Sequence, residues 1–354
     1  MRRIKIPKNF IKIIEHSLEN RTNRVITDVG LTKEYKMENG IDQGEIISPL
    51  LWIIYYDPVF TKIRREKGIG YKMQHNWQPN LTLKNQLTIE IEIFNITFMD
   101  DTTWLSNSKT NLEKQVTIAD SFNRFNGTKV NPEKSKLIVI NSREKEENNH
   151  IKYGKHDTII HPEKNNSSIR FLGVWISETN NKTFIKKQVI KDVNNIYFLT
   201  KGKKITAEMM TYVINMVAIL RMEYKANLTI FNENEAQNIT TNLRKLLRYK
   251  IGLPNTASNA MLGKKEVYNM IDFYDKQTEN HITNLVSRLN DKKSLGISTE
   301  IRLRQLQQNE WLYNNPLEIW EYDNVNSFKG NIIAQILCLA KSLGLVINIT
   351  NANM

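Results

Sequence analysis

Hydrophobic residues recur along the chain with two different spacings, and the spacing changes near residue 180. Before that point, segments in which apolar and polar residues alternate stand between segments with a helical period of about 3.6 residues. Beyond it, nearly all apolar residues follow the helical period. We therefore predict a mixed α+β arrangement for residues 1–177 and an all-α arrangement after it.

Three helices are predicted in the first part of the chain. One begins at Pro7 and continues to about residue 20, and another covers residues 110–127. Between them, a buried helix is expected to begin at Ser48, which caps it, with Pro49 at its first position, and to continue to Phe60.

Extended segments are predicted where apolar residues alternate or β-branched residues gather. The clearest series is Ile89, Ile91 and Ile93, and a hairpin pattern follows it, in which two β-prone segments flank the acidic turn Met99-Asp100-Asp101. Further extended segments are expected at residues 21–38, 94–98, 102–105, 137–140 and 169–177. Polar stretches at 64–86 and 142–168 are predicted to be irregular.

Composition narrows the possible partners. The 354 residues include 50 Lys and Arg against 37 Asp and Glu, a formal net charge of +13. This surplus favours nucleic acid or an anionic surface as partner over an acidic small substrate, with a role in solubility alone as the alternative. The basic runs Lys201-Gly202-Lys203-Lys204 and 244–250 suit phosphate contacts or an ordinary solvated helix face.

Several classes of protein are excluded. No stretch approaches the roughly 18 to 20 apolar residues of a membrane-spanning helix, and no signal peptide is visible, so no membrane contact is expected. The single cysteine, Cys338, rules out an intrachain disulfide framework and a cysteine zinc site. We expect a reducing, intracellular location, in the nucleus or the cytoplasm.

Two short motifs are candidates for chemistry. Asp100 and Asp101 are predicted at an exposed hairpin tip, where carboxylates can bind Mg²⁺ together with substrate phosphates. Upstream, Gly40 and Gly44 surround Gln43, so the backbone there can approach a ligand closely while the amide contacts a base or sugar. Each motif, taken alone, also has a purely structural explanation. The first can be an ordinary solvated acidic turn, and the second an ordinary loop that leads into a helix.

In this order, the motifs resemble the palm of reverse transcriptases, most closely the non-LTR (LINE-like) retrotransposon branch. The pattern Gly-x-x-Gln-Gly-x-x-x-Ser-Pro begins at Gly40, and aromatic-x-Asp-Asp follows at Phe98. Residues 130–141 are similar to the segment after the acidic hairpin in that family, and residues 169–176 to its primer-grip hairpin. The resemblance covers about residues 1–178.

The resemblance implies an RNA-directed DNA polymerase that uses Mg²⁺ or Mn²⁺ in two-metal nucleotidyl transfer. Asp100 corresponds to a metal ligand, and Asp101 to its neighbour with the weaker metal role. Lys134 sits where the family has a basic residue that protonates the leaving pyrophosphate. The implied partners are an RNA template, a DNA primer and dNTPs.

The remaining roles follow from the same resemblance. Gln43 and Gly44 correspond to pocket residues that lie against the incoming nucleotide and template, and Ser48 and Pro49 open the helix behind them. Three consecutive residues resemble those that hold the primer end in the family: Phe171, Leu172 and Gly173.

One departure from the family pattern bears on activity. The mechanism needs a third carboxylate upstream of Gly40, and the only aspartate there, Asp28, lies in a turn context that does not match the family segment. We therefore expect a truncated, catalytically incomplete chain: a partial palm over 1–178, a thumb-like domain over 179–260 and a helical extension over 261–354. The alternatives are a non-catalytic nucleic-acid-binding remnant and a plain interaction or structural remnant.

Overall fold

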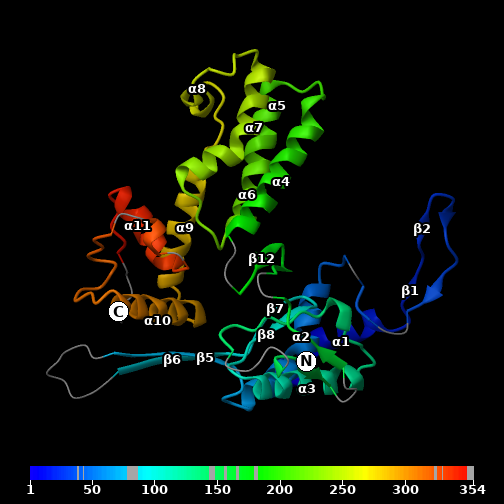
Figure 1. Ribbon diagram of the computed structural model, residues 1–354. Coiled ribbons are helices and arrows are strands. Elements are labelled where there is room, and N and C mark those ends of the chain that lie inside the picture. The colour runs from blue at the N-terminus through cyan, green and yellow to red at the C-terminus, as the bar shows by residue number, and fades with distance from the viewer. Residues whose placement is uncertain are drawn as a thin grey trace. The chain divides into compact units, whose positions relative to one another are not determined.

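The computed structural model describes residues 1–37, 40–42, 44–77, 87–142, 148–154, 158–164, 167–178, 182–322, 325–328 and 330–348. The chain divides into two compact units (Figure 1). The first consists of residues 1–70 and 94–129, and the second of residues 71–93 and 130–354. None of the helices in the described parts combines the length and apolar character needed to cross a membrane.

The first unit is built around two helices and a hairpin. Helices α2 (Ser48–Arg65) and α3 (Lys109–Phe125) pack on each other, and β7 (Asn95–Phe98) pairs with β8 (Asp101–Trp104). Their shared core contains Val59, Ile63, Ile69 and Ala119, with aromatic rings from α2, α3 and the hairpin around it. Burial of these apolar side chains stabilises the unit.

The remainder of the first unit is a helix and a long two-stranded ribbon. A short 3-10 turn (Arg2–Ile4) precedes helix α1 (Lys8–Leu18), which buries Ile11 and Ile14. The ribbon that follows consists of four short strands in two antiparallel ladders: β1 (Thr22–Asn23) with β4 (Tyr35–Lys36), and β2 (Ile26–Thr27) with β3 (Gly30–Leu31).

In the second unit, a ribbon from the first part of the sequence packs on a helix from the last. Strand β5 (Tyr71–Trp77) pairs antiparallel with β6 (Leu87–Ile93), and α10 (Ser294–Asn309) lies along the pair (Figure 1). The Arg304 guanidinium lies 4.2 Å from the centre of the Trp77 ring, a cation–π contact. This helix covers the apolar face of an otherwise isolated ribbon.

The helices of the second unit form two adjoining cores. The first lies among α4 (Lys182–Lys201), α5 (Ala207–Val213), α6 (Leu220–Ala226) and α7 (Glu233–Ile251), which lie side by side in Figure 1. A π-helical segment, Ile214–Ile219, joins α5 to α6. The second core lies among α9 (Phe273–Leu289), α10 and α11 (Ile332–Ser342). Two short helices complete the set: α8 (Asn259–Gly263) and a 3-10 turn (Val325–Phe328).

Three further small elements belong to the second unit. A 3-10 turn (Pro132–Lys134) is followed by the hairpins β9 (Ile151–Tyr153) with β10 (Thr158–Ile160), and β11 (Ile169–Phe171) with β12 (Val174–Ile176). Across the described parts of the chain, strands pair only two by two. The predicted α+β class is therefore confirmed in its coarse form, as helices with small antiparallel strand pairs.

Four predictions about local structure are wrong. Residues 64–86 are not irregular throughout, because they contain β5, and 142–168 contain β9 and β10. The strand predicted at 137–140 is absent: only Leu137 forms an isolated bridge, with Pro162. Ile47 rather than Ser48 occupies the N-cap position of α2, and no side chain caps the helix there. The Ser48 hydroxyl donates instead to the carbonyl oxygen of Asp42. The predicted domain boundaries at 178 and 260 stay predictions.

Candidate functional site

The acidic hairpin tip lies in the first unit. Phe98 pairs with Asp101, which leaves Met99 and Asp100 as the two turn residues. Met99 adopts a left-handed φ of 52°, consistent with a tight turn between paired strands. The side chains of Asp100 and Asp101 are exposed and form no ion pair with any described residue. Two exposed carboxylates therefore lie at the end of a paired hairpin, without a described cation in an ion pair with them.

Helix α2 holds this tip in position. The indole nitrogen Nε1 of Trp52 donates a 2.7 Å hydrogen bond to the carbonyl oxygen of Met99. One turn further along, burial raises the pKa of the Tyr56 phenol, and the negative charges of Tyr55 and Asp100 raise it further. The Asp100 carboxylate is thus close enough to α2 for its charge to act on a half-buried tyrosine.

Hydrogen bonds to Asp42 hold the loop that leads into α2. Asp42 accepts hydrogen bonds from Arg21 at 3.0 Å and from Asn23 at 3.1 Å. Arg21 also donates to the carbonyl oxygen of Gly40 at 2.7 Å, and the Ser48 hydroxyl donates to that of Asp42 at 2.6 Å. Ser48 and Pro49 open α2, as predicted. The loop is therefore tied at one end to β1 and at the other to the helix that supports the acidic tip.

The two glycines of this loop have backbone conformations that suit glycine. Gly40 and Gly44 have φ angles of 105° and 96°, a region that residues with a Cβ rarely adopt. Gly44 is exposed, with nothing within 4 Å of where a Cβ would lie. Gln43, between them, lies outside the described residues, so its predicted contact stays a prediction.

The other predicted site residues lie in the second unit. Lys134 is exposed at the end of the 3-10 turn, where the Asn131 side chain accepts from its backbone N–H. Phe171 ends β11, and Leu172 and Gly173 form the turn, with φ angles of 47° and 85°. The Tyr224 hydroxyl of α6 donates to the Leu172 carbonyl oxygen. This hairpin is thus docked on the helical bundle of its own unit.

Sequence reasoning missed the residues that support the acidic tip. Trp52, Tyr55 and Tyr56 form an aromatic cluster on α2, with Trp52 and Tyr56 ring centres 5.0 Å apart. The signal was present, since aromatic residues three and four positions apart share a helix face. The partner of that face could not be inferred, because it comes from a distant hairpin.

The donor set at the tip suits a hard divalent cation. Mg²⁺ and Mn²⁺ prefer carboxylate oxygens, and Mg²⁺ usually takes one or two of them together with substrate phosphates. Asp100 and Asp101 can supply such ligands, and no described cation competes for them by an ion pair. Within the described residues, no group of three or more His, Cys, Asp and Glu side chains gathers as a ready-made metal site.

Residues 1–176 match the family model of reverse transcriptase (RNA-dependent DNA polymerase). This part of the chain is therefore a reverse transcriptase domain, which confirms that part of the resemblance inferred from the motifs. Both motifs, the loop before α2 and the hairpin at Asp100, lie within the matched residues. A domain of this kind implies a nucleic-acid template and primer, with dNTPs as substrates.

Proposed function

We propose that the chain derives from a reverse transcriptase of the non-LTR (LINE-like) retrotransposon branch, and that its parent is an RNA-directed DNA polymerase. In this proposal residues 1–178 are a partial palm, 179–260 a thumb and 261–354 a helical extension. The observation that carries it is the acidic hairpin tip, which α2 supports. The loop that leads into α2 carries the Gly-x-x-Gln-Gly motif. A nuclear or cytoplasmic location belongs to the same proposal.

The proposed roles follow the motif positions. Asp100 is the principal metal ligand, and Asp101 assists it. Gln43 and Gly44 lie against the nucleotide and template, while Ser48 and Pro49 position that loop. Bound Mg²⁺ or Mn²⁺ would neutralise phosphate charge and activate the primer hydroxyl.

Two further roles concern the second unit. Lys134 is proposed to donate a proton to the pyrophosphate leaving group. Phe171, Leu172 and Gly173 are proposed to hold the primer end. The docking of their hairpin on α6 supports a fixed platform rather than a loose turn.

The chain by itself is proposed to bind a primer–template without extending it. The two-metal reaction needs a third carboxylate, and the residues before Gly40 contain a single aspartate, Asp28. Asp28 is exposed in the turn between β2 and β3. A non-catalytic nucleic-acid-binding role is the second candidate, which the net charge of +13 favours.

The test combines cation binding with primer extension. Electron paramagnetic resonance measures Mn²⁺ binding to the purified chain, and extension is assayed on an RNA template with a DNA primer. We expect Asp100→Asn to weaken Mn²⁺ binding several-fold and the matched change Asp28→Asn to leave it unchanged. Mn²⁺ binding that is indifferent to Asp100→Asn would contradict the proposed metal site.

Extension would distinguish a complete polymerase from both candidate functions, and Mn²⁺ binding at Asp100 distinguishes the incomplete polymerase from a non-catalytic binder. Binding of the primer–template that weakens steeply with salt, without extension, fits both candidates. Extension that is lost in Asp100→Asn would show a complete polymerase and overturn that part of the proposal. Absence of any nucleic-acid binding would contradict both candidates.

A further inference from the structure

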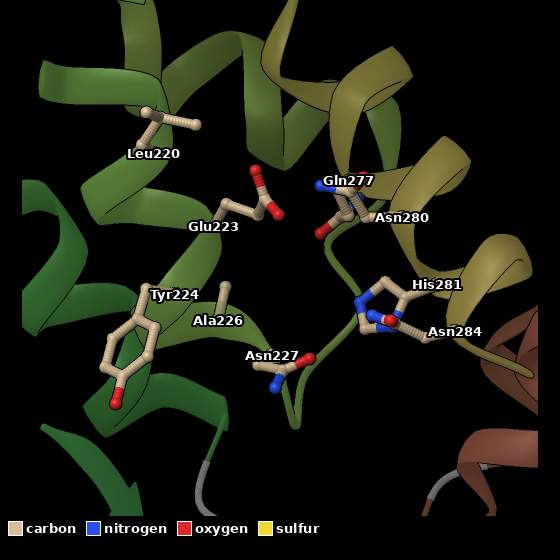
Figure 2. A pocket seen from close by; sticks show the side chains of 9 residues that line it. All are labelled: Leu220, Glu223, Tyr224, Ala226, Asn227, Gln277, Asn280, His281 and Asn284. Carbon is tan, nitrogen blue, oxygen red and sulfur yellow. The ribbon is translucent and has the colours of Figure 1, made fainter. Parts of the chain in front are cut away.

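A pocket of about 190 Å³ lies in the second unit between α6 and α9 (Figure 2). It is smaller than the roughly 300 to 1,000 Å³ typical of sites for drug-sized ligands, so it suits a fragment such as one planar ring system. The polar residues that carry the argument are Glu223 from α6 and Asn280 and His281 from α9. None of the proposed site residues lines this pocket.

Glu223 lines the pocket with a carboxyl group that has one unpaired, buried oxygen. Figure 2 shows its carboxyl group directed into the space between the two helices. Oxygen Oε2 is buried and has no hydrogen-bond partner among the described residues, while Asn280 hydrogen-bonds the same carboxyl group. Burial raises the pKa of Glu223, and the nearby Lys276, itself paired with Glu279 at 2.9 Å, opposes that rise. A buried oxygen without a partner costs free energy that a ligand N–H would recover.

His281 adds a second acceptor. It is 6% exposed, and burial lowers its pKa to about 4, so the ring is neutral at pH 7. A neutral imidazole has one N–H donor and one acceptor nitrogen. Its hydrogen bond to the Thr229 backbone favours the protonated ring, so the ring donates there. The other nitrogen is thus left as an acceptor on the ring that Figure 2 shows facing the pocket.

The rest of the wall is fixed and partly apolar. The Gln277 side chain is fully engaged with the backbone of Phe231, accepting from its N–H and donating to its carbonyl oxygen, both at 2.8 Å. Leu220, Tyr224 and Ala226 line the side formed by α6. A flat ring can pack against such a wall while its edge faces the acceptors.

These features select a neutral ligand with several N–H donors on one edge. No lysine or arginine lines the pocket among the described residues, so nothing there compensates a phosphate. The net charge of +13 attracts a nucleic-acid strand to the protein. Guanine is the base with two adjacent N–H donors, at N1 and N2, that one carboxylate can accept together.

We propose that this pocket binds an unpaired guanine base of a single-stranded nucleic acid, with Glu223 accepting from its Watson–Crick edge. Recognition of unstacked bases by edge hydrogen bonds and ring contacts is the usual mode for single-stranded RNA. The inference rests on the proposed function for its nucleic-acid partner, and it adds a preference for one base outside the acidic hairpin.

The experiment measures binding of short fluorescent oligouridines by anisotropy. A single central guanosine should tighten binding about tenfold over oligouridine alone, as expected for one well-made pair of base contacts. Inosine, which lacks the 2-amino group, should lose most of that gain. The analogue 7-deazaguanosine, whose Watson–Crick edge is intact, should keep it.

Variants then assign the preference to the pocket. Glu223→Gln should abolish the guanosine gain, and His281→Gln should reduce it. Glu208→Gln, an equal charge change at an exposed position of α5, should keep it. Thermal unfolding of each variant shows whether it still folds. If a variant does not fold, the comparison of guanosine with inosine on the unmodified chain decides whether the 2-amino group is recognised.

The outcomes separate this inference from the proposed function. Tight oligouridine binding without a guanosine gain overturns the guanine pocket and leaves the proposed function standing. No binding of any oligonucleotide overturns both. Competition by arginine amide that exceeds competition by guanosine would show a cation site and overturn the assignment of guanine.

Discussion

The indole nitrogen of Trp52 and the carbonyl oxygen of Met99 are joined by a 2.7 Å hydrogen bond, which connects the first turns of α2 to the tip of the β7–β8 hairpin. The bond bridges two segments that are distant in the sequence, and its acceptor directly precedes Asp100. The orientation of the exposed carboxylates therefore depends on a helix that also begins at the Gly-rich loop.

Replacing Trp52 with Phe tests that connection. A smaller aromatic ring remains and the N–H donor is lost, and we expect a loss of about 1 kcal/mol in the free energy of unfolding, the usual value for one hydrogen bond. Urea denaturation measures it. Trp311→Phe is the control, because Trp311 is 95% exposed. Equal effects in the two variants would mean that the hydrogen bond contributes nothing.

Gly173→Ala is expected to destabilise the second unit. Gly173 has a φ of 85°, and a Cβ there would lie 2.9 Å from Cε1 of Tyr224. The left-handed conformation alone costs roughly 1 to 2 kcal/mol for a residue with a Cβ. In Gly202→Ala the new methyl group meets no atom within 4 Å and the φ is not left-handed, so thermal unfolding should show little change.

Arg304→Lys should loosen the β5–β6 ribbon. The substitution keeps the positive charge but loses the planar group that stacks on Trp77, a contact worth about 0.5 to 2 kcal/mol. Amide hydrogen exchange in β5 and β6 should accelerate while exchange in α4 stays unchanged. Arg302→Lys, at an exposed position of the same helix, should have no such effect. Unaltered exchange in Arg304→Lys would argue against this contact as the anchor.

The free energy of unfolding is expected to fall on acidification because His281 is buried. Burial, with a smaller contribution from Arg288, lowers its folded pKa from 6.5 to about 4. Between these values the unfolded chain binds a proton that the folded chain does not, so stability falls as the pH drops from 6.5 and the loss is complete near pH 4. The shift corresponds to about 3 kcal/mol.

Denaturation at a series of pH values tests this expectation. In His281→Gln, which keeps a donor for the Thr229 carbonyl group, the slope of stability against pH between 6.5 and 4 should become shallower. The same change at the exposed His16 is the control. A slope that is equally steep with and without His281 would show that other groups cause the acid sensitivity.

The sequence predicts most elements of this fold, and the failures have physical causes. Ile89, Ile91 and Ile93 alternate with polar residues, which is sufficient to predict β6. Its partner β5 places His75 in the equivalent buried position, paired with Ile89, and a buried polar residue hides the alternation. Residues 137–140 have β propensity, but propensity does not supply a partner strand.

In the candidate site, too, local patterns predict the elements but not the contacts between them. A two-residue turn between β-prone segments was enough to predict Asp100 at an exposed tip. The helix start at Ser48 was close to correct, but its hydroxyl bonds the loop rather than the helix, because Asp42 turns a carbonyl group toward it. Contacts such as Trp52 with Met99 depend on tertiary packing, which no local pattern encodes.

The docking of β5 and β6 on α10 has a consequence for how the chain matures on the ribosome. Arg304 is synthesised about 230 residues after Trp77, which at ordinary elongation rates is a delay of roughly 10 to 45 s. Throughout that interval the apolar face of the ribbon has no helix to cover it. A nascent chain in this state is a natural client for chaperones, and the yield of intact protein should depend on their supply more than on the final stability.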